Sequence, residues 1–157
     1  MLILGLTGSH DRQGFDCGQP ELNDWLRHIA RQHHNKGLSK TFVAILEDQP
    51  ARICGYYALT LTEVDTQSLP EARRRKLPRM IPGIRLVRLA VDARFQGKRL
   101  GELLLVDALE RVRFIHEHAG VTGLFVDAID AKAAAFYAHF GFEAFVDDPL
   151  KLFLPVK

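Results

Sequence analysis

The chain has 157 residues, 47% of them hydrophobic, and a formal net charge of +2. That length allows one domain with a substantial core and is short for two, so we expect a single domain over residues 1–157. No apolar run reaches the roughly 20 residues of a membrane span, and the N-terminus lacks a secretory pattern, which predicts a cytoplasmic protein without a membrane partner. The two cysteines form no CxxC pair and no metal-ligand spacing, which argues against a disulfide framework and a metal site.

The first part of the chain alternates strand and helix patterns. Residues 2–6 have the pattern of a strand, and a turn-rich stretch follows. A helix is predicted from Pro20 to Gly37, with one apolar face at helical spacing: Leu22, Trp25, Leu26, Ile29, Ala30 and His33. Residues 41–46 and 53–62 are predicted as two strands joined by a turn.

The middle of the chain predicts a short basic helix at residues 69–77 and a strand at residues 83–91. A long helix at residues 100–118 follows, and Gly120 is expected to cap it in the left-handed conformation. Apolar residues at helical spacing predict the buried face of that helix: Leu104, Leu105, Ala108, Leu109 and Val112.

The last part of the chain begins with a nearly continuous apolar strand at residues 123–128, which suits a central position in a sheet. Asp130 can cap a last helix at residues 131–140, and residues 143–146 and 152–156 return to strand. Strands and helices therefore alternate around a mixed sheet, which predicts an α/β or α+β domain of three layers.

The stretch between the strand at residues 83–91 and the long helix is typical of a phosphate site. Backbone N–H groups in the first turn of a helix lack partners and lie at the positive end of the helix dipole, so they stabilise an anion. Gly97 and Gly101 let backbone approach a ligand closely, and Lys98 and Arg99 add positive charge. A glycine-containing turn from strand to helix also occurs for structural reasons alone.

The last predicted helix carries the string AFYAHFGF at residues 135–142. Phe136 and Phe140 share one helix face and are expected in the core. Tyr137 is turned about 100° away from them and can face a neighbouring cleft. A lone tyrosine in such a position is more often a packing residue.

These two motifs resemble those of the GNAT acetyltransferase superfamily, whose acetyl-CoA loop (Gln or Arg)-Gly-x-Gly-x-(Gly or Ala) follows a strand. Arg99 stands where that family usually has its middle glycine, and it fits there without strain if its φ stays below zero. The resemblance implies the GNAT fold, a central mixed, mostly antiparallel sheet with splayed central strands, flanked by helices. It also implies acetyl-CoA as the cofactor, bound by Leu89, Ala90, Val91, Gln96, Gly97, Lys98, Arg99, Leu100, Gly101 and Phe136.

The same resemblance implies how acetyl transfer works. Backbone N–H groups of the strand polarise the thioester carbonyl, and Tyr137 acts as the general acid for the leaving thiolate. No histidine or carboxylate stands out as a base, because Glu63 and Asp92 lie at strand ends, where carboxylates are more often solvated or paired. An α-amine, with a pKa of about 7.7–8.0, is largely neutral without a base, whereas lysine is not, so the sequence favours an α-amino substrate.

The N-terminal string FDCGQPELNDWL at residues 15–26 resembles the opening of GNAT toxins from bacterial type II toxin–antitoxin modules. Residues 41–43 and 55–59 also look like that group, so the resemblance covers nearly the whole chain. A cap and an amphipathic helix would explain Leu22, Trp25 and Leu26 but not the string FDCG. Such toxins acetylate the α-amino group of aminoacyl-tRNA and so block translation.

Positive charge is concentrated at residues 71–99, where ten basic residues and two acidic ones give a net charge of +8. A polyanionic partner fits this segment, although a solvated surface helix and ordinary strand edges would also explain it. Charged tRNA is the implied substrate, and the residues expected to bind it are Arg73, Arg74, Arg75, Lys76, Arg79 and Arg85.

The toxin resemblance adds two further partners, a cognate antitoxin of the ribbon-helix-helix type and a second copy of the chain in a homodimer. Two other functions stay open on the sequence. One is a GNAT enzyme that acetylates a small-molecule amine or a protein N-terminus. The other is a non-catalytic module that binds acetyl-CoA or nucleic acid, against which the retained Tyr137 argues.

Overall fold

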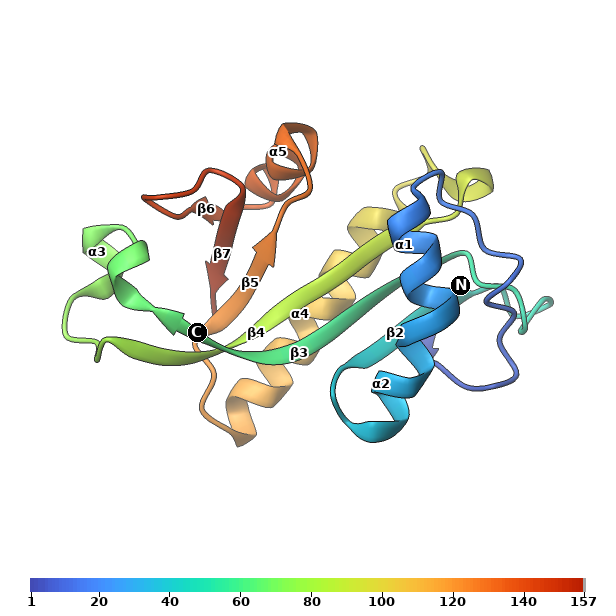
Figure 1. The fold of residues 1–157 in the computed structure, drawn as a ribbon, viewed down its shortest axis with the longest axis horizontal. Helices are drawn as coiled ribbons and strands as arrows, with labels where there is room; N and C mark the ends of the chain where they lie inside the picture. Colours follow the sequence, from blue (N-terminus) through green and yellow to red (C-terminus); the bar gives the residue numbers. More distant parts are fainter. Residues whose placement is uncertain (157) are drawn as a thin grey trace. The chain divides into compact units, whose positions relative to one another are not determined.

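The computed structural model describes residues 1–156 and contains one seven-stranded sheet with the strand order β1-β2-β3-β4-β5-β7-β6 (Figure 1). Four neighbouring pairs, β1–β2, β2–β3, β5–β7 and β6–β7, are antiparallel, and β4–β5 is parallel. The sheet is therefore mixed and mostly antiparallel, as expected. The strands are β1 (Leu2–Gly5), β2 (Lys40–Ile45), β3 (Gly55–Asp65), β4 (Met80–Val91), β5 (Gly123–Asp127), β6 (Glu143–Ala144) and β7 (Lys151–Pro155).

The helices agree with the sequence patterns in order and, for the longest one, in both bounds. They are α1 (Pro20–Trp25), α2 (Arg31–Lys36), α3 (Glu71–Arg74), α4 (Leu100–His118) and α5 (Ala131–His139). The Asp130 carboxylate accepts a hydrogen bond of 2.8 Å from the Ala133 N–H, so it caps α5 as predicted. No helix within residues 1–156 combines the length and the apolar character needed to cross a membrane.

By its internal contacts the chain divides into two compact units, and the single domain stays a prediction. The first unit holds residues 1–60 and 87–109, and the second holds residues 61–86 and the chain from residue 110 onward.

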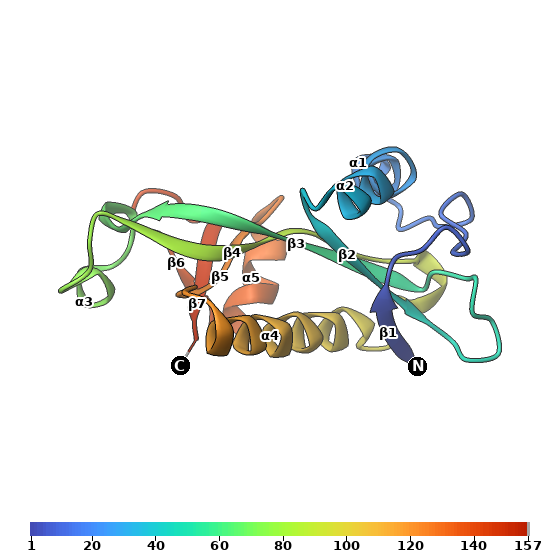
Figure 2. The same ribbon diagram turned by 90° about the horizontal axis from the view of Figure 1, so that it is seen from below.

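In the first unit, adjacent tyrosines of β3 hold helices on opposite faces of the sheet. The Tyr56 hydroxyl donates to the Leu22 carbonyl oxygen of α1 at 2.7 Å, and the Tyr57 hydroxyl donates to the Asp107 carboxylate of α4 at 2.5 Å. Successive side chains of a strand point to opposite faces, so these two bonds fix α1 above the sheet and the first half of α4 below it (Figure 2). The Trp25 ring stacks on Tyr56 in the core, with their centroids 6.0 Å apart.

The helix predicted from Pro20 to Gly37 is interrupted by a π-helical turn at Leu26–Ala30. Gly37 ends the helix with a φ of +74°, as expected. Ile29 is 39% exposed and not part of the core, which corrects the predicted face. A π turn accommodates an extra residue, so the 3.6-residue spacing no longer decides which side chains face the sheet.

The second unit has an aromatic core over β5 and β7. Phe125 stacks on Phe153 with ring centroids 5.9 Å apart, and α5 packs against β7. Two expectations are wrong here. The basic helix α3 spans only four residues, because Arg75 already takes an extended ψ of 134°. Gly120 does not adopt a positive φ, because the Ala119 N–H continues the helical pattern by bonding to Ile115 at 2.7 Å.

Candidate functional site

The segment between β4 and α4 forms a sharply turned basic loop, which we call the cofactor loop (residues 96–101). Gly97 has a φ of +78°, Arg99 a φ of +64°, and α4 begins at the next residue. The condition that Arg99 keeps φ below zero is therefore wrong. Arg99 takes the left-handed conformation that glycine adopts freely, and its carbonyl accepts the first bond of the helix from the Leu103 N–H at 3.1 Å.

The start of α4 offers unpaired backbone donors. Within residues 1–156, the backbone N–H groups of Leu100, Gly101 and Glu102 have no hydrogen-bond acceptor. These groups lie at the positive end of a 19-residue helix, beside the cations Lys98 and Arg99. The loop can therefore hold the phosphates of a ligand, which is the chemistry predicted for it.

The end of β4 leads into this loop, and its pairing with β5 is short. The parallel register with β5 covers only residues 84–86 of β4. Leu89, Ala90 and Val91 lie beyond that register, so their backbone groups are not paired with β5. A strand whose edge is unpaired can hydrogen-bond to an extended ligand.

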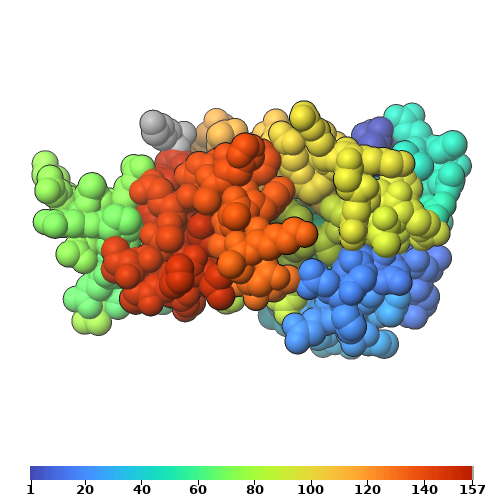
Figure 3. All heavy atoms as spheres, turned by 90° about the horizontal axis from the view of Figure 1, so that it is seen from above, coloured from blue at the N-terminus to red at the C-terminus, as the bar shows by residue number. Residues whose placement is uncertain are grey.

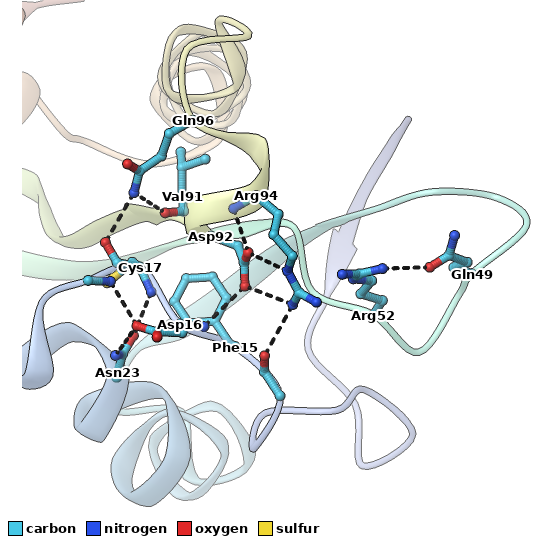
Figure 4. A network of polar contacts seen from close by, with 12 residues as sticks. Phe15, Asp16, Cys17, Asn23, Gln49, Arg52, Val91, Asp92, Arg94 and Gln96 are labelled. Carbon is cyan, nitrogen blue, oxygen red and sulfur yellow. Dashed lines mark hydrogen bonds and ion pairs between the residues drawn. The ribbon is translucent and has the colours of Figure 1, made fainter.

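Asp92, directly after β4, is 1% exposed and fully engaged (Figure 4). Its carboxylate accepts hydrogen bonds from the backbone N–H groups of Asp16 and Arg94 and from the Arg94 guanidinium. Burial, the largest influence, raises the pKa of Asp92, but together these hydrogen bonds hold that pKa below its ordinary value. A carboxylate that is ionised and paired in this way is a poor general base. The structure therefore agrees with the expectation that Asp92 is a paired carboxylate.

Tyr137, in α5, is buried, with 7% of its surface exposed. Burial raises the pKa of its phenol above that of an exposed tyrosine. Within residues 1–156 its hydroxyl has no hydrogen-bond partner. The hydroxyl oxygen is not fully shielded from solvent. The ring is therefore packed, and the hydroxyl stays protonated and free of any protein partner within residues 1–156.

The face assigned to the aromatic residues of α5 is wrong. Phe136 and Phe140 are only partly buried, and Tyr137 is the deeply buried one. Tyr137 is the one residue of α5 that is buried, so it marks the side of the helix that packs inward, and α5 packs against β7.

Half of the cations expected to bind a polyanion are paired with carboxylates outside residues 71–99. Arg73 bonds to Glu143 at 2.5 Å, Arg79 bonds to Asp65 at 3.3 Å, and Arg85 pairs with Asp127. The other three occupy α3 and the turn after it and are exposed: Arg74, Arg75 and Lys76. Arg74 makes one long bond of 3.4 Å to the Gln67 carbonyl oxygen, and Arg75 and Lys76 have no partner within residues 1–156.

The two cysteines are buried free thiols. Burial raises the pKa of Cys17 and of Cys54, so both thiols are protonated at neutral pH and neither is an activated nucleophile.

Comparison with known proteins agrees with this geometry. A family model described as an acetyltransferase (GNAT) domain matches residues 37–144. The chain is 38% identical over 152 residues to the tRNA-acetylating toxin of Mycobacterium tuberculosis, which covers 97% of this chain and 90% of that protein.

Solved structures of toxins are similar over almost the entire chain. One is AtaT complexed with acetyl-methionyl-tRNAfMet, with a TM-score of 0.92 and 31% identity, covering 98% of this chain and 94% of that one. Another is a tyrosine-to-phenylalanine mutant of AtaT bound to the C-terminus of the antitoxin AtaR and to acetyl-CoA. Its TM-score is 0.82 and its identity 29%, over 98% of this chain and 92% of that one. With a family model matching more than half of its residues and a relative of 38% identity along nearly all of its length, this chain belongs to the GNAT acetyltransferase family.

Proposed function

We propose that this protein transfers the acetyl group of acetyl-CoA to the α-amino group of an aminoacyl-tRNA and so acts as a toxin that blocks translation. The observation that carries the proposal is the basic, left-handed cofactor loop, which leads into α4 with the first backbone N–H groups of that helix free. The comparisons support it, because AtaT was captured with acetyl-methionyl-tRNAfMet. In that product the amino acid is attached through its carboxyl group, so the amine bears the acetyl group.

The residues present fit acetyl-CoA. The cofactor loop would hold the pyrophosphate through backbone N–H groups of Gly97 to Gly101 and the charges of Lys98 and Arg99. Leu89, Ala90 and Val91 would pair with the extended arm and direct backbone N–H groups at the reacting carbonyl. Phe136, partly buried on α5, would contribute apolar surface. Bound acetyl-CoA supplies an activated acetyl group as a thioester.

Tyr137 would supply the proton that the departing sulfur needs. Its raised pKa keeps the hydroxyl protonated through the physiological range, and no residue within 1–156 competes for its hydrogen bond. The tyrosine-to-phenylalanine mutant of AtaT carries the same kind of change that would remove this proton.

The acceptor amine would lose its proton to water. Asp92 is paired and Glu63 is exposed, so neither suits a strong base. An α-amine with a pKa of about 7.7–8.0 is substantially neutral without help, whereas a lysine amine near 10.4 is not. The site thus favours an aminoacyl group over a protein lysine.

The tRNA would be bound by the six basic residues expected between residues 73 and 85, of which Arg74, Arg75 and Lys76 are those without an ion pair. An antitoxin partner follows from the similarity to AtaT, whose structure contains the AtaR C-terminus. The ribbon-helix-helix type of that antitoxin, a homodimer and a cytoplasmic location stay predictions.

Incubation with labelled acetyl-CoA and a mixture of charged and uncharged tRNAs tests the proposal. We expect label only on charged tRNA, bound through an amide that survives hydrolysis of the aminoacyl ester as an N-acetyl amino acid. Label on free amino acids, polyamines or a protein N-terminus, with none on charged tRNA, would instead support an ordinary GNAT enzyme.

Arg99 gives a separate prediction about the loop. A left-handed arginine costs on the order of 1 kcal/mol relative to an unstrained residue, which glycine would avoid. Arg99→Gly should therefore raise the free energy of unfolding by up to about 1 kcal/mol and weaken acetyl-CoA binding severalfold, because a phosphate contact is lost. Thermal unfolding and calorimetric titration measure both effects, and binding that is unchanged would remove Arg99 from the proposed phosphate site.

A further inference from the structure

Packing alone does not explain the string FDCG, which forms a closed turn at residues 15–18 that we call the FDCG turn. Phe15 packs edge-on against Tyr56 with centroids 5.4 Å apart. One Asp16 carboxylate oxygen accepts the Gly18 N–H at 2.9 Å and the side-chain amide of Asn23 at 3.0 Å. The other end of that amide accepts the Cys17 N–H at 2.9 Å. Asn23 is buried in α1, so the turn is tied to that helix.

The FDCG turn is also hydrogen-bonded to both ends of the segment that leads from β4 into the cofactor loop (Figure 4). The Asp16 N–H donates to the Asp92 carboxylate at 3.1 Å, and the Ala93 N–H donates to the Asp16 carbonyl oxygen at 2.8 Å. The Gln96 side-chain amide donates to the carbonyl oxygens of Cys17 at 3.0 Å and Val91 at 2.9 Å. In the space-filling view the blue part of the chain near the N-terminus lies against the yellow part that contains the cofactor loop (Figure 3).

We propose that the FDCG turn is a positioning element for acetyl-CoA, which holds the cofactor loop in its binding conformation. The inference rests on the proposed function only in assigning acetyl-CoA to that loop. A loop with a left-handed arginine stores strain and would relax to other conformations unless the surrounding structure held it. A loop that is already held in its binding conformation loses less conformational entropy when the ligand binds.

Asn23 is the residue that best distinguishes a positioning role of the FDCG turn from direct contact with the ligand. Its side chain bonds to Asp16 and Cys17, and neither bond involves the cofactor loop. The hydrogen bonds through which Asn23 can act on acetyl-CoA are therefore those to the FDCG turn. Asn23→Asp keeps the shape of the side chain but removes its N–H donor and sets a second carboxylate against Asp16.

Asn23→Asp should raise the KM and Kd for acetyl-CoA on the order of tenfold, while kcat at saturating acetyl-CoA and the KM for aminoacyl-tRNA stay within about twofold. Hydrogen exchange of the ligand-free protein should be faster for amides 93–101. The exchanged pair Asp16→Asn/Asn23→Asp restores one donor facing one acceptor between the two side chains but leaves the Gly18 N–H without its acceptor, so it should recover only part of the affinity. Asp48→Asn, in an exposed turn, removes a carboxylate without touching the network and should change nothing.

If Asn23 had a purely structural role, Asn23→Asp would instead lower the unfolding temperature and the amount of active enzyme and would leave the KM for acetyl-CoA unchanged. Should Asn23→Asp fail to fold, Gln96→Met removes the donor to Cys17 at the loop itself, and hydrogen exchange of amides 93–101 in the ligand-free protein should then be faster, which loss of a direct ligand contact would not cause. Unchanged Kd values and unchanged exchange at residues 93–101 would overturn the proposal. If the wild-type protein does not bind acetyl-CoA, the proposed function fails, and the exchange comparison alone decides whether the FDCG turn braces the loop.

Discussion

Tyr137→Phe should lower the rate of acetyl transfer by about 100-fold or more and leave the Kd for acetyl-CoA and the KM for aminoacyl-tRNA unchanged. The substitution removes one oxygen atom and preserves the ring that packs against Phe142, with centroids 5.4 Å apart. Because the hydroxyl has no protein partner within residues 1–156, its removal should not lower the free energy of unfolding. Single-turnover kinetics with calorimetry measure these quantities separately.

Tyr56 is the matched control for this prediction, since it is a second buried tyrosine whose hydroxyl is used by the fold. Its bond of 2.7 Å to the Leu22 carbonyl oxygen is lost in Tyr56→Phe, which should cost about 1–3 kcal/mol of unfolding free energy because a buried acceptor is left unpaired. Transfer rates of the folded variant should stay near those of the wild type. If the two variants lose activity in parallel with stability, Tyr137 has a packing role and the assignment of the acid is wrong.

The pH profile adds a check on the same residue. Burial raises the pKa of Tyr137, so the protonated form that donates the proton persists to higher pH than an exposed phenol with its pKa near 10. The rate should rise as the α-amine loses its proton through about pH 7.7–8.0 and should then show no fall below about pH 10. A falling limb near neutrality that disappears in Tyr137→Phe would contradict this protonation state.

Local signals were enough to predict several elements from the sequence. The Asp130 cap and the buried face of α4 depend on residues within one or two helical turns, and both are confirmed. The strand that enters the cofactor loop and the helix that follows it were placed from the same kind of short-range pattern.

Features that depend on distant partners could not be predicted in this way. The left-handed Arg99 is tolerated where backbone from the FDCG turn, about 80 residues earlier, holds the adjoining segment. The burial of Tyr137 in place of Phe136 depends on which face of a nine-residue helix meets the sheet. Asp92 was expected to be solvated or paired rather than a base, but nothing in the local sequence reveals that its partner is the Asp16 N–H.

The basic segment shows the same limit and leads to the second large prediction. Composition gives residues 71–99 a net charge of +8, but the ion pairs of Arg73, Arg79 and Arg85 with carboxylates from other parts of the chain reduce the charge available to a polyanion. These pairs are exposed, so they contribute little to stability. Of the six residues expected to bind tRNA, the three without an ion pair lie in α3 and the turn after it, where Arg74 and Arg79 also line a hollow of about 690 Å³.

Reversing the charge of Arg74, Arg75 and Lys76 together, each to Glu, should raise the KM for aminoacyl-tRNA by about 10- to 100-fold and leave the Kd for acetyl-CoA within about twofold. Each lost phosphate contact should lower the slope of log affinity against log salt by roughly 1, so the salt dependence should flatten by about 2–3. Binding measured between low and moderate salt gives that slope directly.

The matched variant carries three reversals of the same size at exposed cations outside the basic segment, Arg31, Arg113 and Lys132. It has the same net charge as the first variant, so a general repulsion between an acidic protein and tRNA would weaken both equally. A specific contact surface weakens only the reversal at residues 74–76. Equal losses in the two variants, or a parallel loss of acetyl-CoA binding, would show that the basic residues around α3 do not form the tRNA surface.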